Sequence, residues 1–146
     1  MGSDYVIVEL TTSDTYPLRL AVLRTDTPSR DVTFPDDDLP GTVHLGVRYG
    51  DEIVAVSTWI PRACGDVAAV QLRGMATVAR LQGHGVGGVL LEAGCGRVAS
   101  VAPLVWARAR DTALEFYLRH GFSVEGDGFL DDLTGKPHHL IVRPLP

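Results

Sequence analysis

Four glycines fall within six residues, at Gly83, Gly85, Gly87 and Gly88, immediately before an apolar run with helical spacing. Glycine loses more conformational entropy on folding than any other residue, so a dense cluster needs positive φ angles or close approach to the main chain. The beginning of a helix adds unpaired N–H donors and the positive end of the helix dipole. The segment therefore predicts an anion-binding loop that leads into a helix.

Patterns on both sides of this loop predict a sheet with helices packed on it. Helical spacing indicates helices at residues 18–23, from residue 86 onward and at 111–120. Short β-branched or alternating runs indicate strands at residues 5–10, 42–49, 52–60, 67–78, 104–109, 122–125 and 139–142. The order βαβββαβαββ predicts an α/β (α+β) fold in one domain, residues 1–146. We expect a mixed, mainly antiparallel sheet of about six or seven strands flanked by about three or four helices.

Three local features of these elements are specific enough to be tested by a structure. Alternation in the strand at 67–78 predicts one face made by Leu72, Ala76 and Val78 and the other by Gln71, Arg73, Met75 and Thr77. Thr112 and Glu115 match a capping box at a helix start. Gly94 and Gly96 inside the long helix each cost about 1 kcal/mol relative to alanine, which predicts close packing of that helix against the sheet.

Charge and cysteine content exclude several kinds of partner. With 18 acidic and 13 basic side chains and a net charge of −5, the chain lacks the basic stripe that nucleic acid requires. Cys64 and Cys95 have neither a C-x-x-C pair nor a histidine cluster nearby, so we expect buried reduced thiols and no metal. No run approaches the roughly 18 apolar residues of a membrane span and the N-terminus lacks a basic leader, so we expect a cytoplasmic protein without membrane contact.

Two familiar phosphate-binding loops do not fit the glycine cluster. The Walker A pattern needs a lysine and a hydroxyl directly after its last glycine, but Val89 and Leu90 follow Gly88. The dinucleotide pattern G-x-G-x-x-G is matched by Gly83, Gly85 and Gly88. Three antiparallel-type strands precede it, however, where that fold requires the first strand of a βαβ unit.

A third pattern, Q-x-x-G-x-G, is matched by Gln82, Gly85 and Gly87 between a strand and a helix. Here the chain resembles the GNAT acetyltransferase superfamily, whose signature loop binds the pyrophosphate of acetyl-coenzyme A. A second segment agrees: ARARDTALEFYLRHGF, residues 107–122, resembles the superfamily's later motif of a strand end, a short helix with an F-Y pair and a G-F that opens the next strand. The resemblance covers residues 42–126 well and implies the GNAT fold, acetyl-CoA as co-substrate and acetyl transfer to an amine.

The resemblance also implies which residues bind the cofactor. They lie in the strand before the loop, in the loop and in the later motif: Met75, Ala76, Thr77, Val78, Gln82, Gly83, His84, Gly85, Val86, Gly87, Gly88, Arg108 and Phe116. A main-chain N–H within residues 75–78 would polarise the thioester carbonyl. Several branches of the superfamily carry an asparagine that contacts the cofactor near the end of the fifth strand. Arg108 occupies that place here and would bind a coenzyme A phosphate instead.

Tyr117, in the F-Y pair, matches the superfamily's general acid; the alternative is a core aromatic on a helix face. A phenol with a reference pKa of about 10 stays protonated at neutral pH and can donate to a leaving thiolate. The base that deprotonates the amine is left open by the sequence. His138 and His139 are the titrating candidates, with an ordinary turn before a strand as the alternative, and Glu52 is the one acid that the neighbouring strands offer.

The sequence thus predicts an N-acetyltransferase that acts on a primary amine of a small molecule by direct attack in a ternary complex. The alternatives are a non-catalytic acyl-CoA-binding sensor and an acetyltransferase for protein N-termini or lysines. The runs 36–38 and 131–132 are predicted to be solvated acidic loops, with attraction of a cationic amine as the alternative. An edge strand near the C-terminus also suits a homodimer.

Overall fold

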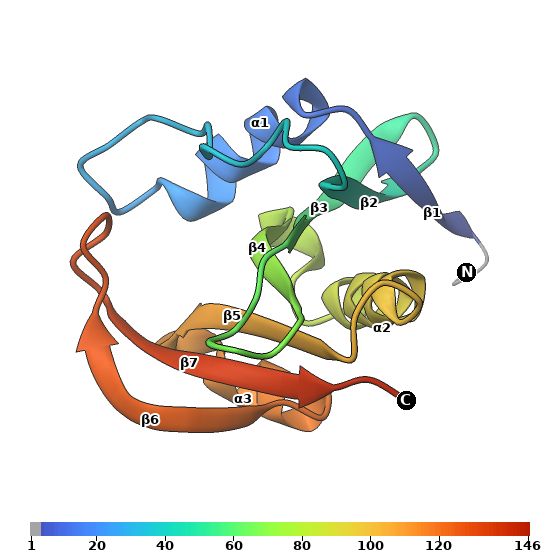
Figure 1. The fold of residues 1–146 in the computed structure, drawn as a ribbon. Helices are drawn as coiled ribbons and strands as arrows, with labels where there is room; N and C mark the ends of the chain where they lie inside the picture. The colour runs from blue at the N-terminus through green and yellow to red at the C-terminus, as the bar shows by residue number, and fades with distance from the viewer. Residues whose placement is uncertain (1–3) are drawn as a thin grey trace.

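Seven strands form one mixed sheet in the computed structural model, which describes residues 4–146 (Figure 1). The strands are β1 (Tyr5–Leu10), β2 (Val43–Tyr49), β3 (Glu52–Pro61), β4 (Val70–Thr77), β5 (Leu104–Arg110), β6 (Ser123–Leu130) and β7 (Pro137–Pro144). Their order across the sheet is β1-β2-β3-β4-β5-β7-β6, and every neighbouring pair is antiparallel except β4 and β5. The predicted element order and the mixed, mainly antiparallel sheet are confirmed.

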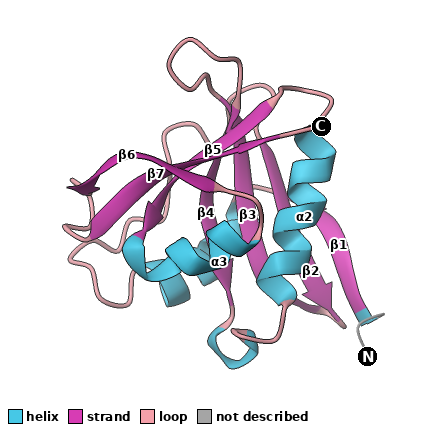
Figure 2. Cartoon of the chain, turned by 90° about the horizontal axis from the view of Figure 1, so that it is seen from below, coloured by secondary structure: helices cyan, strands magenta, loops and turns pink. Residues whose placement is uncertain are grey.

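Helices pack on both faces of the sheet. Within residues 4–146 they are α1 (Tyr16–Leu18), α2 (Val86–Val98) and α3 (Leu114–Arg119), and α1 continues directly into a π-helical turn at Arg19–Leu23. Figure 2 shows α2 and α3 over the same face, and Figure 1 shows α1 on the opposite side of β3 from α2. None of these helices is long and apolar enough to cross a membrane.

The long helix α2 approaches the sheet closely at Gly94. A Cβ atom on Gly94 would lie 1.8 Å from Cζ2 of Trp59, a buried side chain of β3, so that only glycine fits at this crossing. A Cβ atom on Gly96 would meet nothing within 4 Å. The predicted close packing is therefore confirmed at Gly94 and wrong at Gly96.

The start of α3 differs from the prediction. Residues Asp111–Ala113 form a short 3₁₀ turn, and no side chain caps either this turn or α3. The predicted capping box of Thr112 and Glu115 is therefore wrong. The carboxylate of Asp111 instead accepts a hydrogen bond of 2.6 Å from Nδ1 of His139, which fixes the turn to β7.

A bulge in β4 reverses the predicted pattern of inward and outward side chains. Two residues of β4, Gly74 and Met75, lie opposite the single residue Ser57 of β3. Beyond the bulge each side chain therefore points to the other face of the sheet. Leu72 and Met75 pack in the apolar cluster under α2, whereas Ala76 packs in the cluster under α1. The predicted common face of Leu72 and Ala76 is wrong for this reason.

The parallel strands β4 and β5 separate soon after they meet. Their ladder consists of two residue pairs, Val70 with Val105 and Gln71 with Trp106. Beyond them β4 stays paired with β3 as far as Thr77, and β5 stays paired with β7 along its whole length. The sheet therefore opens between the C-terminal ends of β4 and β5.

The C-terminal hairpin of β6 and β7 is much longer than the predicted strands at 122–125 and 139–142. Its register shifts between Glu125 and Phe129, so the hairpin bends where it extends past the end of β5. β6 is an edge strand with every residue exposed. Pairing of two copies of the chain along this edge stays a prediction.

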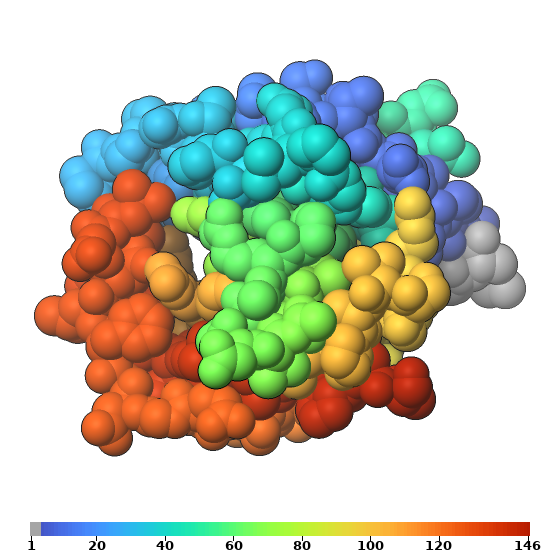
Figure 3. All heavy atoms as spheres, in the orientation of Figure 1, coloured from blue at the N-terminus to red at the C-terminus, as the bar shows by residue number. Residues whose placement is uncertain are grey.

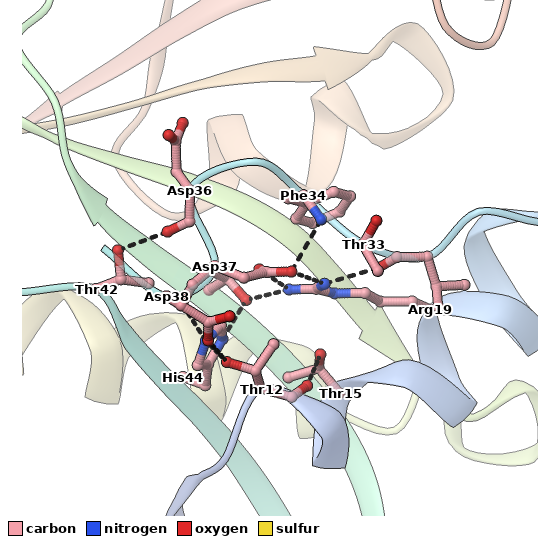
Figure 4. Close-up of polar contacts among 12 residues, drawn as sticks. Thr12, Thr15, Arg19, Thr33, Phe34, Asp36, Asp37, Asp38, Thr42 and His44 are labelled. Atoms are coloured by element: carbon pink, nitrogen blue, oxygen red, sulfur yellow. Dashed lines mark hydrogen bonds and ion pairs between the residues drawn. The ribbon is translucent and has the colours of Figure 1, made fainter. Parts of the chain in front are cut away.

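A buried ion pair holds the segment 24–42 against the sheet (Figure 4). Arg19 donates two hydrogen bonds of 2.9 and 2.8 Å to Asp37, and the two residues are 0% and 5% exposed. Asp37 also accepts from the amide of Phe34 at 2.9 Å, and Arg19 donates to the hydroxyl of Thr58 on β3 at 2.8 Å. The prediction of a solvated acidic loop is wrong for Asp37, because this carboxylate neutralises a buried arginine.

Replacement of Asp37 by asparagine tests the importance of this ion pair for stability. Because the change leaves the Arg19 guanidinium buried without a counter-charge, we expect Asp37→Asn to lower the free energy of unfolding by about 3–5 kcal/mol in chemical denaturation. The neighbouring variant Asp38→Asn is the matched control. Asp38 is exposed and accepts a hydrogen bond from Thr12, so its replacement is expected to change stability by about 0.5 kcal/mol or less.

The same pair predicts a pH dependence of stability. Burial raises the pKa of Asp37, but the hydrogen bonds from Arg19 and the Phe34 amide outweigh burial and lower the pKa below its usual value. A lowered pKa stabilises the fold above the unfolded pKa of about 3.9, and this contribution disappears as the pH falls through the folded pKa. The wild-type protein should therefore lose more stability in acid than Asp37→Asn does; equal losses would contradict the account.

Candidate active site

The glycine loop leads from the end of β4 into α2. Gly83 and Gly85 have φ angles of +81° and +86°, which other residues adopt only at a cost, and Gly85 is the residue before the first turn of α2. The side-chain amide of Gln82 donates a hydrogen bond of 3.0 Å to the carbonyl oxygen of Thr77. Gln82 thus ties the loop to the end of β4.

The first amides of α2 are available to an anion. The amide of Val89 donates to the carbonyl oxygen of Gly85 at 3.1 Å, which is the first bond of the helix. The amides of Val86, Gly87 and Gly88 donate to no group within residues 4–146. Unpaired amides at the positive end of a helix dipole suit an anion, and anion binding by this loop stays a prediction.

A cavity of about 1240 Å³ lies beside this loop, and we name it the glycine-loop cavity. It is lined by residues 75–77 of β4, by the loop and first turns of α2, and by α3 with the turn before it. Nine of the predicted cofactor residues line it: Met75, Ala76, Thr77, Gln82, Gly83, Gly85, Gly87, Gly88 and Phe116. The loop amides and an extended cavity are therefore adjacent.

A second cavity, of about 210 Å³, lies where β4 and β5 have separated, and we name it the hairpin cavity. Its walls come from β4, β5, the segment 24–42 and the β6–β7 hairpin. Figure 3 shows the molecule hollowed between the C-terminal hairpin, in red and orange, and the green part of the chain, beneath the light-blue segment around residue 30. Met75, Ala113 and Tyr117 line both cavities, so the two adjoin at these side chains.

Tyr117 stands at the junction of the two cavities. Its hydroxyl lies 3.8 Å from the sulfur of Met75, and its ring packs edge-on against Phe116 and Phe122 at centroid distances of 5.1 and 5.4 Å. Burial raises the pKa of Tyr117 to about 12. The phenol is therefore a hydrogen-bond donor at neutral pH and not a base.

A main-chain amide of β4 faces the same junction. The amide of Val78 donates to the carbonyl oxygen of Val54 on β3 at 2.8 Å. Because successive amides of a strand point in opposite directions, the amide of Thr77 points away from β3, into the gap that β5 leaves. Within the predicted range 75–78, Thr77 therefore offers a donor toward the cavity, and the Val78 amide is already used by the sheet.

Four of the predicted cofactor residues do not line the glycine-loop cavity. Val78 packs in the core and the side chain of Val86 is buried, so neither side chain reaches the cavity. His84 is exposed, and its Nδ1 donates to the carbonyl oxygen of Gln82 at 3.2 Å. Arg108 lines the hairpin cavity instead, because β5 directs it to the sheet face opposite α2.

The structure separates the three candidates for the base. His138 is buried and lines the hairpin cavity; its Nδ1 donates to the carbonyl oxygen of Lys136 at 2.8 Å, which leaves the lone pair on Nε2. His139 points away and donates to Asp111. Glu52 forms an exposed ion pair with Arg80. Of these candidates, the structure brings only His138 to a cavity that Tyr117 also lines.

Sequence reasoning did not find the arginines of the hairpin cavity. Arg24, Arg73 and Arg110 line it together with Arg108. The signal was present in β5, where Ala107 and Ala109 are buried and arginines alternate with them. Arginines that alternate with buried small residues in an inner strand indicate a polar cavity on one face of the sheet.

The chain is similar over nearly its whole length to known proteins named as acetyltransferases and to solved structures of the same fold. No family model matches the sequence. The chain is 26% identical over 137 residues to the uncharacterised N-acetyltransferase YitI of Bacillus subtilis, covering 91% of each protein. Escherichia coli ElaA has a TM-score of 0.80 at 22% identity, with 95% of this chain and 99% of that chain covered. A GNAT family acetyltransferase from Elizabethkingia anophelis, solved with acetyl-CoA bound, has a TM-score of 0.73 at 17% identity, with 97% and 99% covered.

The raised pKa of Tyr117 gives a direct spectroscopic prediction. Ordinary tyrosines ionise at a pH of about 10, whereas Tyr117 keeps its proton there. The wild-type protein and Tyr117→Phe should therefore gain the same tyrosinate absorbance over this pH range. Absorbance titration of the folded wild-type protein and the variant checks this. A smaller gain in the variant would show that Tyr117 ionises normally and would contradict the raised pKa.

Proposed function

We propose that this chain, whose fold and curated relative are those of GNAT-type N-acetyltransferases, transfers the acetyl group of acetyl-CoA to a primary amine of a small molecule, by direct attack in a ternary complex. The observation that carries the proposal is the junction at Tyr117, where two cavities adjoin. The larger cavity is lined by the glycine loop and the start of α2, and the smaller one is lined in part by the hairpin. This arrangement suits a cofactor that arrives from one side and an acceptor that arrives from the other.

The glycine-loop cavity fits the cofactor. The free amides of Val86, Gly87 and Gly88 at the start of α2 match the demands of a pyrophosphate, which needs several convergent donors and a favourable dipole. The amide of Thr77 would donate to the thioester carbonyl oxygen and stabilise the negative charge that develops there. A solved GNAT neighbour with acetyl-CoA bound supports the same cofactor.

Tyr117 would assist departure of the coenzyme A thiolate. When the amine nitrogen bonds to the carbonyl carbon and the carbon–sulfur bond breaks, the Tyr117 hydroxyl donates toward the sulfur. A phenol whose pKa is about 12 gives up its proton reluctantly. The thiolate is formed in the same apolar junction, however, and desolvation raises its pKa as well, which reduces the mismatch.

His138 would accept the proton that the attacking amine loses. Its Nδ1 is held by the carbonyl oxygen of Lys136, so Nε2 carries the free lone pair. The ring is buried in the wall of the hairpin cavity, on the acceptor side of Tyr117. With the amine proton on His138 and the Tyr117 proton on sulfur, the proton balance closes once solvent exchanges one proton with each residue.

Tyr117→Phe tests the role of the hydroxyl. Because the ring and its packing remain, we expect an unchanged dissociation constant for coenzyme A in calorimetry. With any amine that the wild-type enzyme acetylates, kcat should fall about a hundredfold or more. Tyr49→Phe is the matched control, since Tyr49 is exposed on β2 and lines neither cavity. Full turnover in Tyr117→Phe would remove the hydroxyl from the mechanism.

His138→Gln and His139→Gln form a second matched pair. Loss of the base should lower kcat about a hundredfold or more in His138→Gln at neutral pH, with part of the rate recovered at high pH, where more of the amine is already neutral. His139→Gln removes the same chemical group one residue further along β7 and should keep most of the rate. Equal effects of the two substitutions would show that His138 is not the base.

A further inference from the structure

The hairpin cavity concentrates positive charge in a protein that is negative overall. Among the described residues, four arginines line it: Arg24, Arg73, Arg108 and Arg110. One carboxylate, Asp131, together with His138 and the Tyr117 phenol, completes its titratable lining. The whole chain has a net charge of −5, so this local excess of cations is not a reflection of composition.

Two of these arginines have no acidic partner. Arg73 and Arg108 make neither a hydrogen bond nor an ion pair within residues 4–146; the guanidinium carbon of Arg73 lies 4.4 Å from the ring centre of Phe34, and that of Arg108 lies 6.0 Å from Trp106. Burial lowers the pKa of Arg73, and the nearby charges of Arg62 and Arg108 lower it further. Asp131 opposes this effect, but one carboxylate does not balance the four arginines that line the cavity.

The other two arginines are partly compensated. Arg110 donates to the carbonyl oxygen of Leu23 at 3.0 Å and lies 3.7 Å from Asp26. Arg24 is buried and donates to main-chain carbonyl oxygens, and burial together with the charge of Arg110 lowers its pKa. Their hydrogen bonds to the main chain shape the cavity wall, so Arg73 and Arg108 are the side chains with donors to spare.

The fold holds Arg73 and Arg108 in place. Arg73 precedes the bulge of β4 and stacks on Phe34, whose amide is bound by Asp37 in the buried network of Figure 4. Arg108 projects from β5, which is paired with β7 over its whole length. The guanidinium of Arg73, held against the Phe34 ring, loses little entropy when it binds a planar anion, whereas that of Arg108 is exposed and only its strand is fixed.

Both arginines also lie on the path from solvent. A third cavity, of about 680 Å³, adjoins the hairpin cavity at Arg73, Arg108 and Asp131 and is lined beyond them by Trp106 and the β6–β7 hairpin. Further out its carboxylates are Glu125, Asp127 and Asp132. An acceptor that enters here meets the two free guanidinium groups before it reaches Tyr117.

Asp131 contributes a second element of recognition. Its Oδ2 accepts hydrogen bonds from the amides of Leu133 and Thr134 and from the Thr134 hydroxyl, whereas no bond to Oδ1 is formed within residues 4–146. One carboxylate oxygen beside two free guanidinium groups complements a molecule that carries both signs of charge.

From these contacts we propose that the acceptor is an amine that also bears an anionic group, a carboxylate or a phosphate, which Arg73 and Arg108 bind while the amine points to Tyr117. This assignment rests on the proposed acetyl transfer. A cavity of about 210 Å³ suits a molecule the size of an amino acid rather than a polypeptide segment.

Matched acceptor pairs test the assignment. Lysine against cadaverine and phenylalanine against 2-phenylethylamine differ in the carboxylate, and O-phosphoethanolamine against ethanolamine differs in the phosphate. We expect the anionic member of at least one pair to have a KM about 10- to 100-fold lower, because charge-assisted hydrogen bonds distinguish the two. The acceptor pair with the larger ratio of KM values shows whether the cavity prefers a carboxylate or a phosphate. Equal or better acetylation of the amines that lack an anionic group would overturn the proposal.

Substitution of the arginines assigns the effect to them. Arg108→Gln and Arg73→Gln should raise the KM of the acceptor with the anionic group about tenfold or more and leave that of its counterpart without this group unchanged, with partial rescue by Arg108→Lys. Arg97→Gln is the control, since Arg97 lies on α2 and pairs with Glu9. Because Arg108 is exposed, its variant remains informative if Arg73→Gln fails to fold.

Two kinds of failure are distinguishable in these assays. If none of the tested amines causes thiol release from acetyl-CoA, although coenzyme A binds in calorimetry, acetyl transfer itself is contradicted. Acetylation of amines with no preference for the anionic members, or an equal rise of KM for both members in the arginine variants, would contradict only the recognition of an anionic acceptor.

Discussion

The separation of β4 from β5 after two residue pairs is the constraint on which both halves of the site depend. Had the ladder continued, the Thr77 amide would be consumed by β5 and no passage would connect the two faces of the sheet. Because the strands diverge, α2 can start beside the end of β4. Tyr117 of α3 then lies at the gap between β4 and β5, where it lines both cavities. The bulge at Gly74 directs Arg73 and Met75 to opposite faces of the sheet. Arg73 therefore lies on the proposed acceptor side, and Met75 lies against Tyr117.

The acceptor side relies on a second, buried interaction. The ion pair of Arg19 and Asp37 is costly to desolvate, and such pairs often contribute little net stability compared with apolar packing. Its value here is positional: it fixes Phe34 over the sheet, and Phe34 in turn stacks on Arg73 (Figure 4). A polar anchor in the segment 24–42 thus supports a polar cavity, whereas apolar contacts under α2 support the cofactor side.

The cofactor side could be predicted from the sequence because its determinants are local. Glycine spacing, a following helix and an F-Y pair lie within short stretches of chain, so the sequence alone predicts a shared site for Gln82, Gly85 and Tyr117, and all three line the glycine-loop cavity. The acceptor side arises from distant contacts. A one-residue bulge places Ala76 on the face opposite to the predicted one. Asp37 is buried because it pairs with Arg19, 18 positions earlier. Asp111 accepts a hydrogen bond from His139 and does not cap its own helix. No local pattern carries such pairings, although the alternating arginines of β5 were a signal that could have been used.

The arrangement of two ligands on either side of Tyr117 is most directly tested by a crystal structure of the protein with coenzyme A. The account predicts the pyrophosphate at the amides of residues 86–88 and the sulfur within hydrogen-bonding distance of the Tyr117 hydroxyl. It also predicts that the hairpin cavity, with Arg73 and Arg108, stays open to the acceptor. A pantetheine arm that runs through the hairpin cavity, or a sulfur far from Tyr117, would contradict it.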